Sequence, residues 1–207
     1  MKIITPYHEI MSATPDLERC IEFSGRVCYK SEDKITDDSA CAFVSKIRSI
    51  NHESVLEHGA ITVKFVCDRG VTHELVRHRI ASFSQESTRY CNYTKDKFNN
   101  EITVIDPRGA FPEMSENEFK LWMLAMQATE HYYFAMIESG AKAQLARDVL
   151  PNSLKTEIVM TTNPREWRHV FKLRCAEAAH PQMREVMIPV LKDFAHAWPA
   201  LFGDLVQ

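Results

Sequence analysis

The stretch "RHRIASFSQESTRY", residues 77–90, decides how this chain is interpreted. It places Arg77, His78, Arg79 and Arg89 among small hydroxyl residues, in a chain with 25 Lys+Arg, 28 Asp+Glu and a net charge of −3. With that balance no global positive field attracts nucleic acid or an anionic membrane, so an anion site must be local. The stretch is therefore a solvated basic loop, a nucleic-acid patch or a pocket for a phosphorylated small molecule.

The chain lacks the glycine-rich motifs that hold phosphates, G-x-G-x-x-G and G-x-x-x-x-G-K-[ST], and has only six glycines. Side chains would have to bind a phosphate instead, and the planar guanidinium of arginine can hold two phosphate oxygens at once. The candidate arginines form three groups: Arg77/Arg79/Arg89, Arg147, and Arg165/Arg168/Arg174. Any one of them taken alone is more simply an exposed surface residue. The 77–90 group is different, because a loop of small polar residues and arginines adds nothing obvious to a core.

Outward from this stretch, the sequence predicts strands and helices without a regular alternation. Strands are expected at 2–7, 60–68, 102–106 and 156–162, and helices at 16–30, 38–51, 71–79, 115–139, 141–150, 165–179 and 182–197. Thr14-Pro15 should start the first helix, Ser115 and Glu118 predict a capping box on the longest one, and Asn163 with Glu166 predicts a second box. The pattern indicates the α+β class, a single domain over residues 1–207 and a mixed sheet packed with long helices.

Composition indicates a cytoplasmic protein. No apolar run approaches the length of a membrane span, and the N-terminus lacks the apolar region of a signal peptide. Six scattered cysteines without a C-x-x-C pair are expected to be reduced and mostly buried. In "HESVLEH" (52–58) the two histidines are six residues apart, whereas the two-histidine zinc helix needs a spacing of four, so we expect no metal. His78, between two arginines, should have its protonated form disfavoured by like charge.

The spacing within 77–90 resembles the signature of the flavin-dependent thymidylate synthases, which is Arg-His-Arg, seven residues, then Ser-x-Arg. Arg77-His78-Arg79, residues 80–86 and Ser87-Thr88-Arg89 match it. Five further segments are similar to the same family: "RVCYKS" (26–31), "HESVLEH" (52–58), "ARDVLP" (146–151), "TTNPREW" (161–167) and "KLRCAEAAHPQMRE" (172–185). The resemblance thus extends over most of the chain.

The resemblance implies an enzyme that makes dTMP from dUMP, with methylenetetrahydrofolate as carbon donor and reduced FAD as hydride donor; NADPH re-reduces the flavin. It also implies a homotetramer whose active sites lie where subunits meet. The family's dUMP contacts fall on Glu74, Arg77, Gln85, Glu86, Ser87, Thr88, Arg89, Arg147 and Arg174. Its FAD contacts fall on Ser54, Arg77, His78, Arg79, Gln85, Asn163, Arg165 and His169. Arg174 matches the catalytic arginine that ionises uracil at N3.

General chemistry agrees with this interpretation. Protein side chains cannot transfer a hydride, so a flavin has to perform the redox step while the protein positions it. An arginine beside the uracil ring stabilises its anionic form without losing a proton itself, so no cysteine nucleophile is required. Two alternatives stay open. One is a colourless single-stranded nucleic-acid binding module with Phe83 and Tyr90 as stacking groups. The other is a catalytically silent relative, against which Arg174 speaks.

Overall fold

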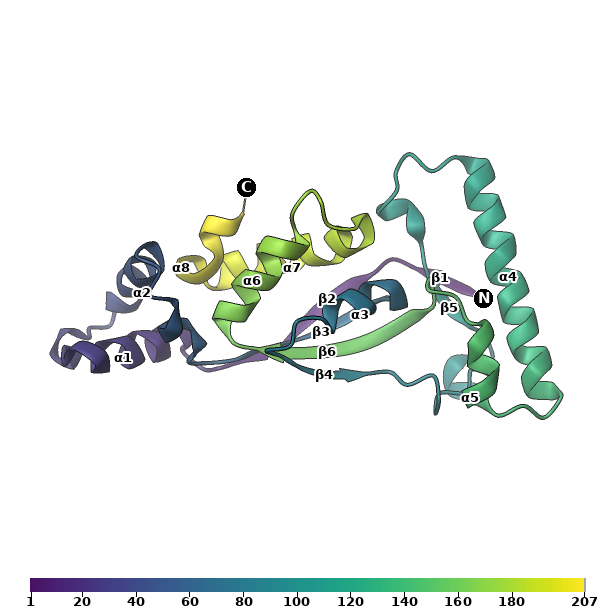
Figure 1. Ribbon diagram of the computed structural model, residues 1–207, viewed down its shortest axis with the longest axis horizontal. Helices are drawn as coiled ribbons and strands as arrows, with labels where there is room; N and C mark the ends of the chain where they lie inside the picture. The colour runs from purple at the N-terminus through teal and green to yellow at the C-terminus, as the bar shows by residue number, and fades with distance from the viewer. Residues whose placement is uncertain (207) are drawn as a thin grey trace. The chain divides into compact units, whose positions relative to one another are not determined.

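The computed structural model describes residues 1–206 and confirms the α+β class (Figure 1). The strands are β1 (Lys2–Ile4), β2 (Tyr7–Ala13), β3 (Ile61–Asp68), β4 (Ser82–Gln85), β5 (Thr103–Ile105) and β6 (Lys155–Thr162). The α-helices are α1 (Leu17–Tyr29), α2 (Ser39–Ser49), α3 (Arg69–Leu75), α4 (Glu116–Glu138), α5 (Ala143–Ala146), α6 (Pro164–Arg174), α7 (Pro181–Ala197) and α8 (Pro199–Phe202). Two short 3₁₀ helices, η2 (Glu53–Glu57) and η5 (Arg147–Val149), carry predicted site residues.

Two compact units are formed from discontinuous segments. The first unit comprises Met1–Tyr7, Phe65–Arg77 and Ser84–Ile158, and the second comprises His8–Lys64, His78–Phe83 and the chain from Val159 on. The four-stranded sheet has the order β2-β3-β6-β4, and each of these strands contributes residues to both units. The single domain over residues 1–207 stays a prediction.

In the first unit, β1 and β5 pair in parallel, with Ile3 opposite Val104. Helix α4 runs beside this pair (Figure 1), and Glu130 Oε1 ties them together by accepting from the Met1 amino group at 3.0 Å and from Ile102 N at 3.0 Å. The apolar core beneath consists of Tyr93, Ile102, Val104, Met126, Tyr133, Ala146 and Leu154. Burial of this apolar surface holds α4 in place, because the hydrophobic effect scales with the apolar area removed from water.

In the second unit, α6 packs against α7 (Figure 1) and also against η2. Its inner face carries Trp167 and Phe171, whose rings pack on Phe194 of α7 with centroids 5.1 and 5.2 Å away. Trp167 Nε1 also donates to Ile61 O at 3.1 Å, so the buried indole N–H is satisfied. This aromatic cluster fixes α6, the helix that carries the predicted cofactor contacts Arg165 and His169 and is capped by Asn163.

Most predicted elements are confirmed, but five details differ. Strands β2 and β4 had no predicted counterpart. The start of the first helix was wrong, because Thr14 Oγ1 accepts from Ala60 N instead of capping α1, which begins at Leu17. Helix α3 ends at Leu75, so Arg77 lies beyond it; α5 is only four residues long; and α6 stops at Arg174.

The cysteine prediction is only half right. All six cysteines are free, as expected, but only Cys67 is buried, while Cys28 and Cys41 are exposed. Within residues 1–206, none of the helices combines the length and apolar character needed to cross a membrane.

Candidate functional site

The Arg-His-Arg motif separates its three side chains by burial. His78 is 5% exposed, whereas Arg77 and Arg79 are both exposed. The segment that follows is anchored at Ile80, whose carbonyl accepts from Thr162 Oγ1 at the end of β6. The motif therefore presents positive charge to solvent and a neutral hydrogen-bonding ring to the interior.

His78 lies at the centre of a polar network with two residues of α6. Arg174 Nε donates to His78 Nε2 at 3.0 Å, and His78 Nδ1 lies 3.1 Å from Glu166 Oε1. The ring of His169 approaches edge-on, with centroids 5.7 Å apart. Burial lowers the pKa of His78, the charge of Arg174 lowers it further, and the hydrogen bond to Glu166 offsets part of the shift. The predicted direction is confirmed, but its main causes are burial and Arg174 and not the flanking arginines.

The sequence of α6 explains how these groups converge. Asn163 caps the helix by accepting from Glu166 N at 2.9 Å, and Pro164 occupies the first turn. The predicted capping box would turn the Glu166 carboxylate back to Asn163. Instead, this carboxylate contacts His78, a residue 88 positions away in the sequence. Arg165 and His169, four residues apart, lie on the exposed face of the helix. Glu166 is a site residue that the sequence prediction missed, because its position three residues after Asn163 suggested a capping role.

Helix α6 also binds η2, where Ser54 lies exposed. Arg165 Nη1 pairs with Glu57 Oε1 at 2.5 Å, and Arg165 Nε lies 3.7 Å from Glu53 Oε2. The hydrogen bond that Arg165 donates to Glu57, together with the charges of Glu57 and Glu53, raises the pKa of Arg165. The second unit thus brings together Ser54, His78, Asn163, Arg165, His169 and Arg174, all of them predicted site residues.

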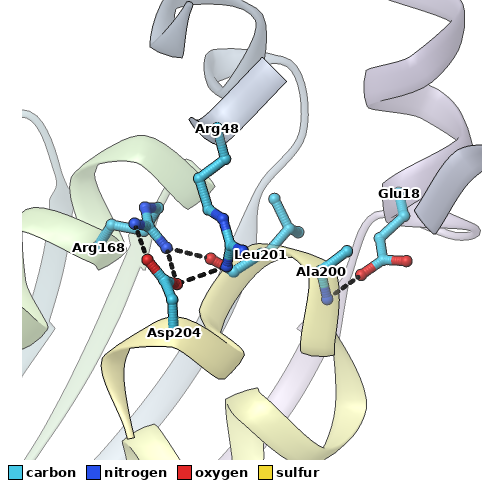
Figure 2. Close-up of polar contacts among 6 residues, drawn as sticks. All are labelled: Glu18, Arg48, Arg168, Ala200, Leu201 and Asp204. Atoms are coloured by element: carbon cyan, nitrogen blue, oxygen red, sulfur yellow. Dashed lines mark hydrogen bonds and ion pairs between the residues drawn. The ribbon is translucent and has the colours of Figure 1, made fainter. Parts of the chain in front are cut away.

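Arg168, by contrast, is part of the scaffold. Its guanidinium donates to Asp204 at 2.7 and 2.8 Å and to the carbonyl of Leu201, while Arg48 donates to Asp204 at 2.6 Å (Figure 2). The Arg168 side chain is only 5% exposed. Of the three α6 arginines considered as phosphate ligands, this one is committed to an internal ion pair.

The dUMP contacts predicted for the first unit include two residues held by internal hydrogen bonds. Gln85 Nε2 donates to Thr72 Oγ1 at 2.9 Å and to Thr156 Oγ1 at 3.3 Å, and both threonines are fully buried. Glu86 accepts from Tyr93 Oη at 3.1 Å and from Lys155 Nζ at 3.1 Å. These bonds orient the Gln85 amide and the Glu86 carboxylate.

Lys155 and Tyr93 were not predicted, since neither falls in a recognisable motif. Both line a cavity of about 330 Å³ together with Glu86. Burial works to lower the pKa of Lys155, but its hydrogen bonds and charge interactions with Glu157 and Glu86 outweigh burial and raise it. Burial, followed by the charge of Glu86, raises the pKa of Tyr93. Lys155 therefore stays cationic and Tyr93 stays a neutral donor.

The remaining predicted dUMP residues in the first unit form a tight turn and an exposed cationic group. The Ser87 carbonyl accepts from Tyr90 N and Cys91 N, and Thr88 is buried. Arg89 is exposed beside the Tyr90 ring, with 5.5 Å from its guanidinium carbon to the ring centroid. Glu74 is half-buried on α3, and Arg147 in η5 is exposed, its Nε 4.0 Å from Asp148.

The geometry also bears on a thiolate nucleophile and on a metal ion. Burial and the charge of Glu86 raise the pKa of Cys91, which gives no support to a thiolate nucleophile. His78, Glu166 and His169 offer one ligand atom each within 4.8 Å of one another, a spacing that could hold a metal ion. However, both ring nitrogens of His78 are engaged in hydrogen bonds, one of them with the cationic Arg174. We interpret this group as a hydrogen-bond network, and the absence of a metal stays a prediction.

Comparisons with known proteins address the family directly. The family model described as "Thymidylate synthase complementing protein" matches residues 9–200. A flavin-dependent thymidylate synthase of Geobacter sulfurreducens is 35% identical over 202 residues, covering 94% of this chain and 84% of the relative. Its counterpart in Pyrococcus abyssi is 36% identical over 167 residues, covering 80% of this chain and 67% of the relative.

Two solved structures share the fold. The UMP/dUMP methylase PolB from Streptomyces cacaoi, bound with 5-Br dUMP, matches with a TM-score of 0.81 at 20% identity, over 98% of this chain and 96% of that one. Thymidylate Synthase X from Helicobacter pylori, with FAD and dUMP, matches with a TM-score of 0.77 at 21% identity, over 98% and 99%. Because the family model covers most of the chain and both sequence relatives exceed 30% identity, this chain belongs to the flavin-dependent thymidylate synthase family.

Proposed function

We propose that this protein catalyses the reductive methylation of dUMP to dTMP. Methylenetetrahydrofolate is the carbon donor, reduced FAD the hydride donor and NADPH the reductant of the flavin. The active form is a cytoplasmic homotetramer, each chain contributing one domain over residues 1–207. Family membership supports the reaction, as do the FAD and dUMP named for the Helicobacter pylori neighbour and the 5-Br dUMP named for the Streptomyces cacaoi neighbour.

The single observation that carries the proposal is the fixed position of Arg174. Its Nε–H donates a hydrogen bond to the buried ring of His78, so the guanidinium is held beside the Arg-His-Arg motif. Arginine keeps its charge at every working pH, and a fixed cation stabilises negative charge that develops on a bound ring. We assign Arg174 the catalytic role of stabilising the anionic uracil, which activates carbon 5 for attack on the one-carbon unit.

The residues present fit a flavin dinucleotide. Arg77 and Arg79 are exposed cations suited to a diphosphate, and Arg165 with His169 lies on the exposed face of α6. We assign the FAD contacts to Ser54, Arg77, His78, Arg79, Gln85, Asn163, Arg165 and His169. When bound, the flavin would supply the hydride, and these side chains would bind and orient it.

The nucleotide fits the second set of residues. Exposed arginines suit a phosphate, and the carboxylate of Glu86 and the amide of Gln85 suit a sugar or a base. We assign dUMP to Glu74, Arg77, Gln85, Glu86, Ser87, Thr88, Arg89, Arg147 and Arg174. In this proposal no metal takes part.

The test combines the visible spectrum with a product assay. The purified protein should show the absorption of bound flavin, or acquire it when FAD is added. It should form dTMP from dUMP, methylenetetrahydrofolate and NADPH, with UMP as the comparison substrate. A colourless protein that takes up no FAD and binds single-stranded oligonucleotides would refute the proposal in favour of a nucleic-acid module.

Arg174→Ala separates binding from chemistry. The variant should retain bound flavin but lose dTMP formation by a factor of about 10² to 10³, since removal of one preorganised donor to a developing anion costs that much. The matched control is Lys172→Ala, which removes an exposed cation two residues away on the same helix and should leave turnover unchanged. Normal turnover in Arg174→Ala would overturn the role assigned to Arg174.

A further inference from the structure

Three side chains join end to end in the second unit: Glu166, His78 and Arg174. Glu166 Oε1 lies 3.1 Å from His78 Nδ1, and Arg174 Nε lies 3.0 Å from His78 Nε2. The side chains of His78 and Glu166 are 4% and 11% exposed. Water therefore competes little for these bonds, and a group left unpaired here would carry a desolvation penalty.

The chemistry of the two end groups determines which nitrogen of His78 carries the proton. Arginine Nε is a donor only, so His78 Nε2 must be the acceptor. A carboxylate oxygen is an acceptor, so His78 Nδ1 must be the donor. A neutral imidazole with its proton on Nδ1 satisfies both contacts at once, whereas a proton on Nε2 would leave two donors facing each other. Burial and Arg174 lower the pKa of His78, which agrees with a neutral ring.

We propose that Glu166 is a positioning residue that acts on Arg174 through His78. By accepting the Nδ1 proton, Glu166 leaves the Nε2 lone pair of His78 directed at Arg174, and that lone pair orients the guanidinium. This inference rests on the proposed function only for its catalytic consequence, since the tautomer of His78 can be measured without turnover. The groups that face His78 are Glu166, Arg174 and His169.

Two substitutions of Glu166 separate hydrogen bonding from charge and volume. In Glu166→Gln the amide oxygen can still accept from His78 Nδ1, so the tautomer and the bond to Arg174 should persist. In Glu166→Leu that acceptor is gone, so the proton is free to move to Nε2 and the guanidinium loses its orientation. Misplacement of a catalytic group by about 1 Å costs up to about 10²-fold in rate.

The direct measurement is ¹⁵N–¹H correlation spectroscopy on protein with labelled histidine rings at pH 8, with the His78 signals identified by their loss in His78→Gln. We expect the Nδ1–H tautomer in the wild type and in Glu166→Gln, and its loss in Glu166→Leu. An Nε2–H tautomer in the wild type would overturn the proposal, whether or not the protein proves to make dTMP. Failure of the proposed function would appear separately, as an absence of dTMP formation by the wild type.

The second measurement is kinetic and compares the change in kcat with the change in the KM for dUMP. Glu166→Leu should lower kcat about 10- to 100-fold while the KM for dUMP and the bound flavin change less than about 3-fold, and Glu166→Gln should restore kcat to within about 3-fold of wild type. Wild-type kcat in folded, flavin-loaded Glu166→Leu would overturn the proposal, as would Glu166→Gln being as slow as Glu166→Leu.

Glu18 provides the matched control for a purely structural carboxylate. Glu18 Oε1 accepts from Ala200 N at 3.2 Å in the same unit (Figure 2), and burial raises its pKa. Glu18→Leu should lower the melting temperature and leave kcat unchanged. If Glu166→Leu does not fold, the wild-type tautomer together with the kcat of Glu166→Gln still decides the question.

Discussion

At the scale of single residues, the Arg-His-Arg motif combines exposed positive charge with a buried hydrogen-bond acceptor. The guanidiniums of Arg77 and Arg79 are exposed to solvent, while the buried ring of His78 supplies an acceptor for Arg174. A third arginine or a lysine at position 78 would have to bury a positive charge next to the cationic Arg174, which is costly. The motif's order of charged, neutral and charged side chains thus follows from burial.

Arg89 provides the residue-scale prediction for the nucleotide. It is exposed and stacks beside Tyr90, so its guanidinium can bind a phosphate without breaking an internal ion pair. Arg89→Ala should raise the KM for dUMP about 10- to 100-fold, since hydrogen bonds to charged groups contribute about 1.5–3 kcal/mol. Steady-state kinetics with varied dUMP and a flavin titration would measure this, and flavin affinity should not change.

Arg108 is the control for the loss of an exposed arginine from the same unit. It pairs with Asp106 at 2.6 Å and is not among the predicted dUMP contacts, so Arg108→Ala should leave the KM for dUMP unchanged. Equal KM values in Arg89→Ala and the wild type would remove Arg89 from the phosphate site.

At the scale of elements, α6 shows why a site can be partly hidden in a sequence. Its buried face carries not only Trp167 and Phe171 but also Glu166 and Arg168, two charged residues that a helical pattern assigns to solvent. Arg168 pairs with Asp204 and Glu166 contacts His78, and both partners are distant in sequence. Local spacing predicted the helix and its Asn163 cap, but tertiary contacts decided which of its charged residues face inward.

The capping box of α4 gives an element-scale prediction. Ser115 Oγ accepts from Glu118 N at 3.3 Å, and Glu118 Oε2 accepts from Ser115 N at 2.8 Å. Ser115→Ala removes the cap and should lower the free energy of unfolding by about 1 kcal/mol, without changing kcat. Urea unfolding followed by circular dichroism would measure the loss.

Ser139, at the opposite end of α4, is the control for that prediction. Its Oγ donates to Met136 O at 2.7 Å, a carbonyl that also accepts from Ala141 N at 3.0 Å and so keeps a partner without the hydroxyl. Ser139→Ala should therefore change the free energy of unfolding by less than about 0.5 kcal/mol. If the two variants were equally stable, the capping box would have no special part in fixing α4.

At the scale of the whole molecule, the sequence predicted the fold class and most long elements, but not the pairings that complete the site. Amphipathic spacing identified α2, the Ser115–Glu118 capping box identified α4, and alternation identified β3. Strand β4 was hidden because "SFSQ" carries too little apolar character to signal a strand, and its Gln85 is held by threonines from two other elements. The resemblance supplied Arg174 and His78, but Glu166, Lys155 and Tyr93 became visible only through three-dimensional contacts.

The Arg48–Asp204–Arg168 cluster provides the prediction that concerns the stability of the fold. It joins α2, α6 and the C-terminal turn through one carboxylate (Figure 2). Burial alone would raise the pKa of Asp204, but the hydrogen bonds from Arg168 and the charges of Arg168 and Arg48 outweigh it, so the pKa is lowered. Asp204→Asn leaves the buried Arg168 short of a partner and should cost about 1–3 kcal/mol at pH 7. We expect the lower part of that range, because the Asp204 side chain is 38% exposed and solvent screens the pair.

The dependence of this loss on pH follows from the lowered pKa. A carboxylate whose pKa is lower in the folded than in the unfolded chain stabilises the fold fully above the unfolded value of about 3.9. That stabilisation disappears as the pH falls through the folded pKa, so the difference between wild type and Asp204→Asn should shrink below about pH 4. Urea unfolding at pH 7 and at acid pH, at one fixed protein concentration, would measure both values.

Asp37→Asn is the control, since Asp37 is 95% exposed and 3.4 Å from Arg19, and it should stay within about 0.5 kcal/mol of wild type at either pH. A constant difference between wild type and Asp204→Asn across this range would mean that the contribution of Asp204 comes from packing and not from its charge.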